Sequence, residues 1–254
     1  MENLCVKGRS IGAGQPLVCV SVMEADREAV IGEVKRLLAL SVDMMEWRVD
    51  AFSQAESPNA VREVLMELAP LLFDTVFVYT FRSKRQGGLR ELDRETIRDI
   101  REAAAETGVV DFIDVEFFEE RYPEREIKKL QAMGAHVIAS HHDFAETPER
   151  NVIRMILNQL HESGADVVKL ALMPRQMQDV LNLLEETNSF HEAYPMQALI
   201  TMSMGAMGTI SRVAGEFFGS CVTFGAGAVA SAPGQLPQEE LKHLLSVMHG
   251  AGKV

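Results

Sequence analysis

The sequence has few of the features that mark several large classes of protein. It contains only three cysteines, Cys5, Cys19 and Cys221, without C-x-x-C spacing, which argues against a disulfide scaffold or a cysteine zinc site. No apolar run is long enough to span a bilayer, and no basic segment precedes an apolar signal core, so we expect a cytoplasmic protein without a membrane partner. Its 25 basic residues are outnumbered by 37 acidic ones, and the net charge of −12 argues against nucleic acid as a partner.

What the sequence contains instead is a regular alternation of two kinds of segment. Short apolar runs bounded by turn residues predict strands, and segments with apolar residues three and four apart predict helices. The expected strands cover residues 17–22, 43–50, 75–82, 111–118, 136–143, 167–174, 197–204 and 221–225. The expected helices cover about residues 25–40, 58–72, 94–107, 123–134, 147–164, 175–188, 210–218 and 237–249.

Eight strand–helix pairs with short connections predict parallel, right-handed crossovers. We therefore expect an α/β fold, a (β/α)8 TIM barrel that occupies residues 1–254 as a single domain and begins with a short hairpin at about 6–12. An open doubly wound sheet is the structural alternative, but no G-x-G-x-x-G motif follows the first strand. The Thr147-Pro148 pair predicts the start of the fifth helix, with Thr147 as its N-cap.

One expected strand carries a lysine among apolar residues. Lys169 lies in Val167-Val168-Lys169-Leu170-Ala171-Leu172-Met173-Pro174, where a charge loses hydration unless it is paired. Burial lowers the pKa of a lysine, and a neutral amine can attack a carbonyl carbon. A lysine that extends to solvent or pairs with an acid is the plainer interpretation, and this strand alone does not decide between them.

Polar residues recur where the expected strands end, which is the catalytic face of a (β/α)8 barrel. Packing does not account for so many polar strand ends, so we interpret them as the rim of an active site. These residues are Ser21, Glu46, Arg48, Arg82, Asp114, Glu116, His141, His142, Asp143, Lys169, Ser203 and Met204, with Ser211, Arg212, Ser231 and Gln235 in the following loops.

These residue types suit a small, anionic, polyhydroxylated keto substrate. The lysine could form an imine with a ketone, and a histidine could move protons near neutral pH. Arg48, Arg82 and Arg212 could hold a carboxylate and keep the pKa of the lysine low through like charge. Adjacent residues His141 and His142 point to opposite faces of a strand, so we expect no metal site there.

The same rim segments resemble type I 3-dehydroquinate dehydratase, a family of the shikimate pathway. Each segment is short, but they follow the order of the family and span nearly the whole chain. They are Glu46-Trp47-Arg48-Val49-Asp50, Thr80-Phe81-Arg82-Ser83, Ser140-His141-His142-Asp143-Phe144, Val168-Lys169-Leu170-Ala171, Thr201-Met202-Ser203-Met204, Ile210-Ser211-Arg212 and Ser231-Ala232-Pro233-Gly234-Gln235.

The resemblance implies a homodimeric barrel that uses neither a metal nor an external cofactor. It implies that Lys169 forms an imine with the C3 ketone of 3-dehydroquinate, and that His142 removes a C2 proton and returns one to the departing C1 hydroxyl. It also implies that Arg212 holds the carboxylate. The substrate contacts that carry over are Ser21, Glu46, Arg48, Arg82, Met204, Arg212, Ser231 and Gln235.

The chain departs from the family pattern at Gln86. Many relatives have a glutamate there that orients the catalytic histidine. A glutamine can hydrogen-bond the imidazole but cannot stabilise imidazolium by charge. We therefore expect Gln86 to orient His142, and Asp114 or Glu116 to supply any charge.

Other functions are open at the level of the sequence. Another imine-forming barrel, such as a class I aldolase, could share the lysine but would not need the rim of histidine and arginines. A non-catalytic barrel that binds a metabolite of the pathway would not need Lys169 and His142. An interaction scaffold would need an exposed apolar helix face.

Overall fold

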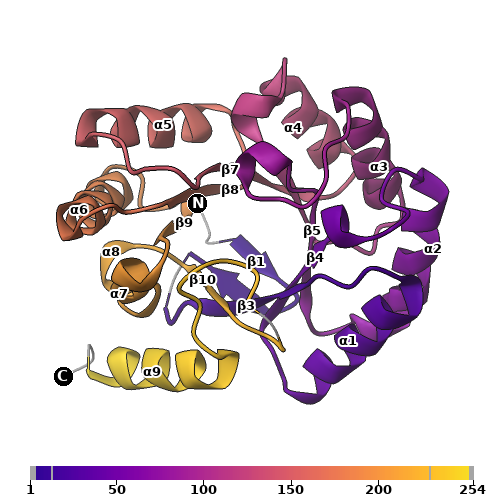
Figure 1. The fold of residues 1–254 in the computed structure, drawn as a ribbon, viewed down its shortest axis with the longest axis horizontal. Helices are drawn as coiled ribbons and strands as arrows, with labels where there is room; N and C mark the ends of the chain where they lie inside the picture. The colour runs from indigo at the N-terminus through magenta and orange to yellow at the C-terminus, as the bar shows by residue number, and fades with distance from the viewer. Residues whose placement is uncertain (1–3, 13, 229, 252–254) are drawn as a thin grey trace.

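Eight parallel strands form the centre of the molecule (Figure 1). The computed structural model describes residues 4–12, 14–228 and 230–251. Cys221 N donates to Leu199 O over 2.8 Å, which joins the two ends of the sheet into a near-closed barrel. In sheet order the strands are β10 (Val222–Gly225), β3 (Leu17–Val22), β4 (Met44–Arg48), β5 (Val76–Thr80), β6 (Phe112–Glu116), β7 (His136–Asp143), β8 (Val167–Leu172) and β9 (Ala198–Ser203). The predicted (β/α)8 architecture is confirmed.

Helices surround these strands on the outside of the barrel (Figure 1). Polar caps begin several of them: Asp26 accepts from Ala29 N, and Asp93 accepts from Thr96 N. The helices are α1 (Arg27–Ala39), α2 (Pro58–Leu68), α3 (Arg94–Glu106), α4 (Pro123–Ala132), α5 (Arg150–Glu162), α6 (Met177–Ala193), α7 (Thr209–Val213), α8 (Gly215–Phe218) and α9 (Gln238–Ala251). Short 3-10 turns lie at η1 (Val49–Ala51), η2 (Ala69–Leu71), η3 (Lys84–Gln86), η4 (Phe117–Glu119) and η5 (Ala206–Gly208).

The structure differs from several of the predicted helices. Helix α5 begins after Glu149 rather than at Thr147, because the Thr147 hydroxyl donates to Met173 O over 3.0 Å and ties the loop to the end of β8. Helix α6 continues to Ala193, where the Tyr194-Pro195 pair ends it, since a residue before proline avoids helical angles. The single helix expected at 210–218 is two short ones, α7 and α8.

Alternation along each strand separates two apolar cores. Outward-facing residues such as Val20, Trp47 and Leu170 pack under the helices. Inward-facing residues such as Met44 and Phe112 fill the lower barrel. The predicted hairpin, formed by β1 (Leu4–Val6) and β2 (Arg9–Ile11), is confirmed. It adds Val6 and Ile11 to the inner core and thereby closes the N-terminal end of the barrel.

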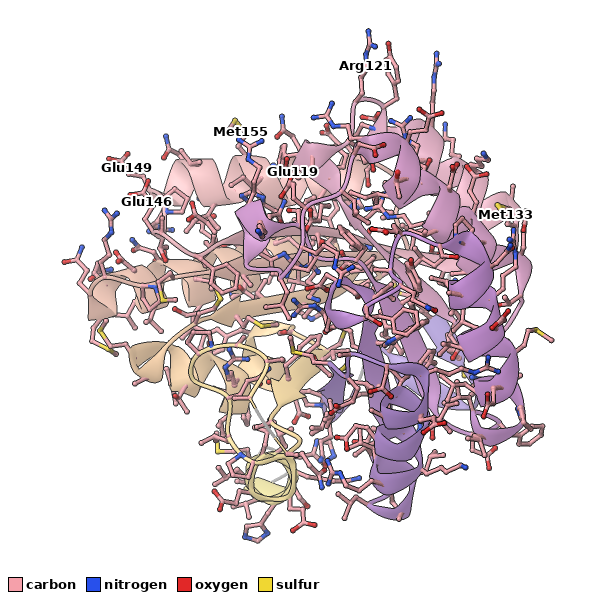
Figure 2. All side chains as sticks on the ribbon, turned by 45° about the vertical axis from the view of Figure 1, so that its right-hand side comes forward. Glu119, Arg121, Met133, Glu146, Glu149 and Met155 are labelled. Atoms are coloured by element: carbon pink, nitrogen blue, oxygen red, sulfur yellow. The ribbon has the colours of Figure 1, made fainter. Side chains whose placement is uncertain are left out.

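The outer surface is polar between scattered apolar side chains. Figure 2 shows Arg121, Glu146 and Glu149 extending away from the body of the molecule, and all three are exposed. Within the described ranges, none of the helices combines the length and the apolar character that a membrane span requires.

Candidate active site

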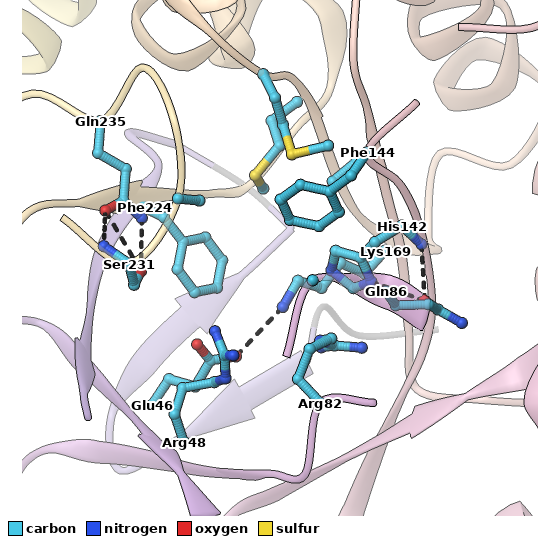
Figure 3. Close-up of a pocket in the computed structure, with 15 residues that line it drawn as sticks. Glu46, Arg48, Arg82, Gln86, His142, Phe144, Lys169, Phe224, Ser231 and Gln235 are labelled. Atoms are coloured by element: carbon cyan, nitrogen blue, oxygen red, sulfur yellow. Dashed lines mark hydrogen bonds and ion pairs between the residues drawn. The ribbon is translucent and has the colours of Figure 1, made fainter. Parts of the chain in front are cut away.

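The upper part of the barrel interior is polar, in contrast to its apolar lower part. On β4 and β6 the inward positions are apolar at the start of the strand and ionisable towards its end, while β7 contributes Ser140 and His142 and β8 contributes Lys169. A cavity opens there (Figure 3). It is lined by Glu46, Arg48, Arg82, Gln86, Gly87, His142, Phe144, Lys169, Ala171, Met202, Met204, Phe224, Ser231, Ala232 and Gln235.

This lining contains nine of the eleven residues expected at the site from the sequence. Ser21 and Arg212 are not part of the lining, but each contacts a residue that is. Ser21 donates to Glu46 over 2.8 Å, and Arg212 Nη1 lies 3.5 Å from Met202 Sδ. Residues from the first to the last barrel strand thus meet at one face.

Lys169 is buried inside the cavity and does not extend to solvent. Its side chain is only 4% exposed. Its Nζ lies 3.3 Å from Glu46 Oε1 and 3.5 Å from Asp114 Oδ2, and 4.5 Å from the centroid of the Phe224 ring. The amine is therefore held by two carboxylates and an aromatic face at the centre of the barrel mouth.

Glu46 contacts several of the groups around the amine. Besides Lys169, its Oε1 accepts from Thr80 Oγ1 over 2.9 Å, while Oε2 accepts from Ser21. Burial acts to raise the pKa of Glu46, but the charges of Lys169 and Arg48 outweigh it and hold the pKa below its usual value. Glu46 is therefore an anion in the folded chain at neutral pH.

Two of the three expected arginines are already paired with acids. Arg48 Nε and Nη2 each donate to Asp50 over 2.8 Å. Arg82 Nη2 contacts Asp114 over 2.9 Å, and Arg82 Nη1 contacts Glu116 over 2.9 Å. Counterions therefore offset the like charge that Arg48 and Arg82 were expected to bring near the lysine, because buried cations lose hydration and need counterions.

Arg212 is the exception among the three. Arg212 is only 1% exposed, and within the described parts of the chain no acidic side chain pairs with it. Its Nη2 donates to Pro233 O over 3.1 Å. Burial lowers its pKa to about 10. A buried guanidinium without a counterion is a place for an anionic group of a ligand.

The segment at residues 230–237, before α9, lines the cavity through Ser231, Ala232 and Gln235 and contacts Arg212 through Pro233. Ser231 Oγ donates to Ser21 Oγ over 3.0 Å, and Ser231 N donates to Gln235 Oε1 over 2.8 Å. Gly205 N donates to Pro233 O over 3.1 Å. This segment thus brings the two residues expected from it, Ser231 and Gln235, to the cavity wall (Figure 3).

His142 lies on the inner face of β7 and contacts Gln86, as expected. Gln86 Oε1 lies 2.9 Å from His142 N and 3.1 Å from His142 Nδ1. Burial lowers the pKa of His142 well below its usual value, and the charges of Arg82 and Lys169 lower it further. Asp114 and Glu116, expected to supply charge to the histidine, are bound to Arg82.

His141 does not line the main cavity that His142 faces. His141 packs edge-to-face on Phe118, with ring centroids 5.0 Å apart. In the residues that the structure describes, no cluster of three or more His, Cys, Asp or Glu is arranged to hold a metal ion.

Sequence reasoning missed several residues of this site. Thr80, Ser140 and Phe224 all touch the lysine cluster but were not expected among its contacts. The period-two alternation could have found Thr80 and Ser140, because each pairs in register with Arg48 or Lys169 on the neighbouring strand.

Comparison with known proteins gives matches over nearly the whole chain. Residues 18–251 match the family model described as Type I 3-dehydroquinase. A 3-dehydroquinate dehydratase of Syntrophotalea carbinolica is 39% identical over 250 residues, covering 98% of this chain and 99% of the relative. One of Bacillus subtilis is 38% identical over 253 residues, covering 98% of each.

Solved structures agree with these matches. A type I 3-dehydroquinate dehydratase of Clostridium difficile with covalently modified comenic acid has a TM-score of 0.94 at 39% identity, covering 98% of this chain and 99% of that one. The 3-dehydroquinate dehydratase of Geobacillus kaustophilus has a TM-score of 0.94 at 30% identity, with coverages of 98% and 97%.

Proposed function

The chain belongs to the type I 3-dehydroquinase family, and on that premise we propose that Lys169 and His142 carry out its reaction. It is an enzyme that dehydrates 3-dehydroquinate to 3-dehydroshikimate in the shikimate pathway, by the Schiff-base mechanism typical of the family. The full-length match sets aside the alternatives of an aldolase and of a non-catalytic barrel.

Lys169 Nζ would add to the C3 ketone of the substrate and form a carbinolamine. Loss of one water then leaves a protonated imine, which withdraws electrons and acidifies the neighbouring C2–H. Glu46 and Asp114, at 3.3 and 3.5 Å from the nitrogen, would balance the positive charge that remains on it.

His142 would remove the C2 proton and leave an enamine. The enamine expels the C1 hydroxyl, which takes the proton from His142 and departs as water. Addition of water to the remaining conjugated imine releases 3-dehydroshikimate and the free lysine, so the net change is the loss of one water. Positioned acid–base help of this kind is typically worth about 10² to 10⁴ in rate.

The substrate carboxylate would bind Arg212, since Arg48 and Arg82 already have acidic partners. A guanidinium can hold a carboxylate through two parallel hydrogen bonds. We assign the substrate contacts to Ser21, Glu46, Arg48, Arg82, Met204, Arg212, Ser231 and Gln235, and the orientation of His142 to Gln86.

One observation carries the proposal: a lysine that is 3% exposed lies in the same cavity as a histidine whose pKa is well below its usual value. Its test is borohydride reduction with 3-dehydroquinate, read by intact mass and peptide mapping. We expect one adduct, on Lys169. The variant Lys169→Ala should lose this adduct, whereas the control variant Lys129→Ala, changed at an exposed lysine, should still form it. An adduct on another lysine would overturn the assignment.

His142→Ala separates the two steps. This variant should still form the adduct but lose dehydration, followed by the ultraviolet absorbance of the enone product, by about 10² or more. Dehydration at the rate of the unchanged chain would show that another group is the base.

We also propose that residues 1–254 form one domain, that the enzyme is a homodimer, and that it works in the cytoplasm, as the family resemblance implies. Size-exclusion chromatography with light scattering tests the assembly, and a mass of one chain would contradict it.

A further inference from the structure

We propose that the hydroxyls of Thr80 and Ser140 make Lys169 easier to deprotonate. Each hydroxyl donates to an acid beside the amine and thereby weakens the attraction of that acid for the ammonium form. This inference rests on the proposed role of Lys169 as the amine that forms the imine. It adds two positioning residues, which act on the amine through Glu46 and Asp114.

The nearest neighbours of Lys169 favour the charged form of its amine, whereas the reaction needs the neutral form. Glu46 Oε1 and Asp114 Oδ2 lie 3.3 and 3.5 Å from Nζ (Figure 3 shows the contact with Glu46). Opposite charges at these distances stabilise an ammonium. An ammonium has no lone pair, so only the neutral amine can attack the ketone. A feature of the site must therefore weaken the effect of the two acids.

The other ionisable groups around the amine are paired, uncharged or outside the cavity lining. Arg48 is bound to Asp50, and Arg82 is bound to Asp114 and Glu116. Burial lowers the pKa of His142 well below its usual value and raises that of the Cys19 thiol well above its own, so both are uncharged at neutral pH. Arg212 lies behind Met202. Groups that bind the two acids directly are therefore the better source of the effect.

Thr80 shares one oxygen of Glu46 with the amine. Thr80 Oγ1 donates to Glu46 Oε1 over 2.9 Å, whereas Lys169 Nζ lies 3.3 Å from the same oxygen. The hydroxyl is thus the closer donor, and it occupies one of the positions at which that oxygen can accept. Because two donors compete for one oxygen, the hydroxyl reduces what the ammonium gains from this acid.

Ser140 has the same relation to the second acid. Its Oγ donates to Asp114 Oδ1 over 2.7 Å and accepts from Arg82 Nη1 over 3.1 Å. These contacts fix the carboxylate with Oδ2 towards Lys169 and Arg82 Nη2. The negative charge of Asp114 is thereby shared among three donors, of which the amine is the most distant.

Packing alone does not require either hydroxyl. Thr80 follows Val76 and Val78 on the inner face of β5, where valine would have a similar shape. Ser140 lies on the inner face of β7 and pairs in register with Lys169. Both residues are 0% exposed, and a buried hydroxyl without a partner is costly. The acids that they bind therefore account for their presence.

The pH dependence of imine formation tests the proposal. Rapid mixing with 3-dehydroquinate, followed by a borohydride quench and intact mass, gives the rate of adduct formation at each pH. In the unchanged chain this rate should rise as the amine loses its proton. In Thr80→Val and in Ser140→Ala the rise should move to higher pH by about half a pH unit or more, the equivalent of one hydrogen bond.

Two controls separate this effect from a loss of structure. Thr80→Ser keeps the hydroxyl and should keep the pH profile of the unchanged chain. Thr187→Val removes a buried hydroxyl on α6 that donates to Leu183 O, outside the cavity lining, and should also leave the profile in place. Urea unfolding checks that each variant is folded, and the two hydroxyl variants test the idea on separate acids.

Profiles of Thr80→Val and Ser140→Ala that stay in place, or that move to lower pH, would overturn the proposal. Adduct formation that slows equally at every pH would show that the hydroxyls have only a structural role. Peptide mapping distinguishes this failure from a failure of the proposed function. An adduct on Lys169 with unmoved profiles would reject only the role of the hydroxyls, whereas an unchanged chain without an adduct on Lys169 would reject the imine itself.

Discussion

Ser231 donates a hydrogen bond to Ser21 across the mouth of the barrel, with 3.0 Å between the two hydroxyl oxygens. Ser21 in turn donates to Glu46, whose other oxygen contacts Lys169. A continuous chain of contacts therefore joins the loop at residues 230–237 to the amine. The loop, far along the chain from the first strand, can thus influence the nitrogen that we expect to attack the substrate.

Ser21→Ala, Ser231→Ala and the double variant measure this coupling. Each single change should lower kcat/KM by about three- to tenfold, since a hydrogen bond of this kind contributes about 0.5–1.5 kcal/mol. Because both changes break the same chain, the double variant should lose less than the product of the two single effects. Steady-state kinetics of the four proteins test this, and strictly multiplicative losses would show that the hydroxyls act independently.

Arg212 should determine how tightly the substrate carboxylate binds. Truncating one partner of a buried, hydrogen-bonded charge pair costs about 2–5 kcal/mol, so Arg212→Ala should raise the dissociation constant about 30-fold or more. Arg212→Lys should recover part of this, because an ammonium keeps the charge but loses the two-pronged geometry. Isothermal titration with a non-reacting carboxylate analogue measures both variants.

Arg62→Ala is the matched control, because this arginine is partly exposed, lies outside the lining of the cavity, and contacts Glu106 and Asn59. It should bind the analogue like the unchanged chain. Equal affinities for Arg212→Ala and Arg62→Ala would place the carboxylate elsewhere.

The sequence predicted the positions of the site residues better than their partners. Strand alternation places Glu46, His142 and Lys169 inside the barrel wherever the strands begin and end, so their meeting depends only on the fold. Pairing depends on how side chains lie in three dimensions. The acids that neutralise Arg82 are on the neighbouring strand β6, 32 and 34 residues away. Contacts between residues so far apart in the sequence leave no pattern in the local periodicity.

The Thr147 cap failed for a similar reason. Its hydroxyl could cap α5 or bind the end of β8, and in the structure it donates to Met173 O. Only the tertiary structure brings Met173 within reach of Thr147. Gln86 lies between these cases: its neighbours Gly87 and Gly88 indicate a tight turn, but the two contacts from one oxygen required the structure.

Asp50 should stabilise the fold in a pH-dependent way. Burial acts to raise its pKa, but hydrogen bonds from Arg48 and from the backbone N–H groups of Leu89 and Arg82 outweigh it and hold the pKa below its usual value. A carboxyl group with a lowered folded pKa stabilises the fold fully above its unfolded pKa, and this stabilisation is lost as the pH falls through the folded value.

Asp50→Asn should therefore lower the free energy of unfolding by about 3 kcal/mol at neutral pH. The difference in the free energy of unfolding between Asp50→Asn and the unchanged chain should become smaller towards roughly pH 3, below the unfolded-state pKa of about 3.9. Urea unfolding at several pH values measures it, with the exposed Asp99→Asn as a control that should change little. A difference that widens as the pH falls would have the wrong sign for this argument.

Gly234 should control the position of the loop at residues 230–237. Its φ is +80°, and a Cβ added there would lie 2.2 Å from Gly205 O, so no small adjustment can accommodate a side chain. Gly234→Ala should displace Pro233, whose carbonyl accepts from Gly205 N and Arg212. The loop would then no longer hold Ser231 and Gln235 against the cavity, so KM should rise about tenfold or more for a loss of about 1.4 kcal/mol.

Gly108→Ala separates this effect from backbone strain alone. Gly108 also has a positive φ, of +64°, but an added Cβ there meets nothing within 4 Å. It should lose only the stability that the positive φ costs and keep its KM, since it lies after α3, away from the residues that line the cavity. Parallel kinetics and urea unfolding of the two variants test the idea, and equal KM values would show that the loop does not need this conformation to bind substrate.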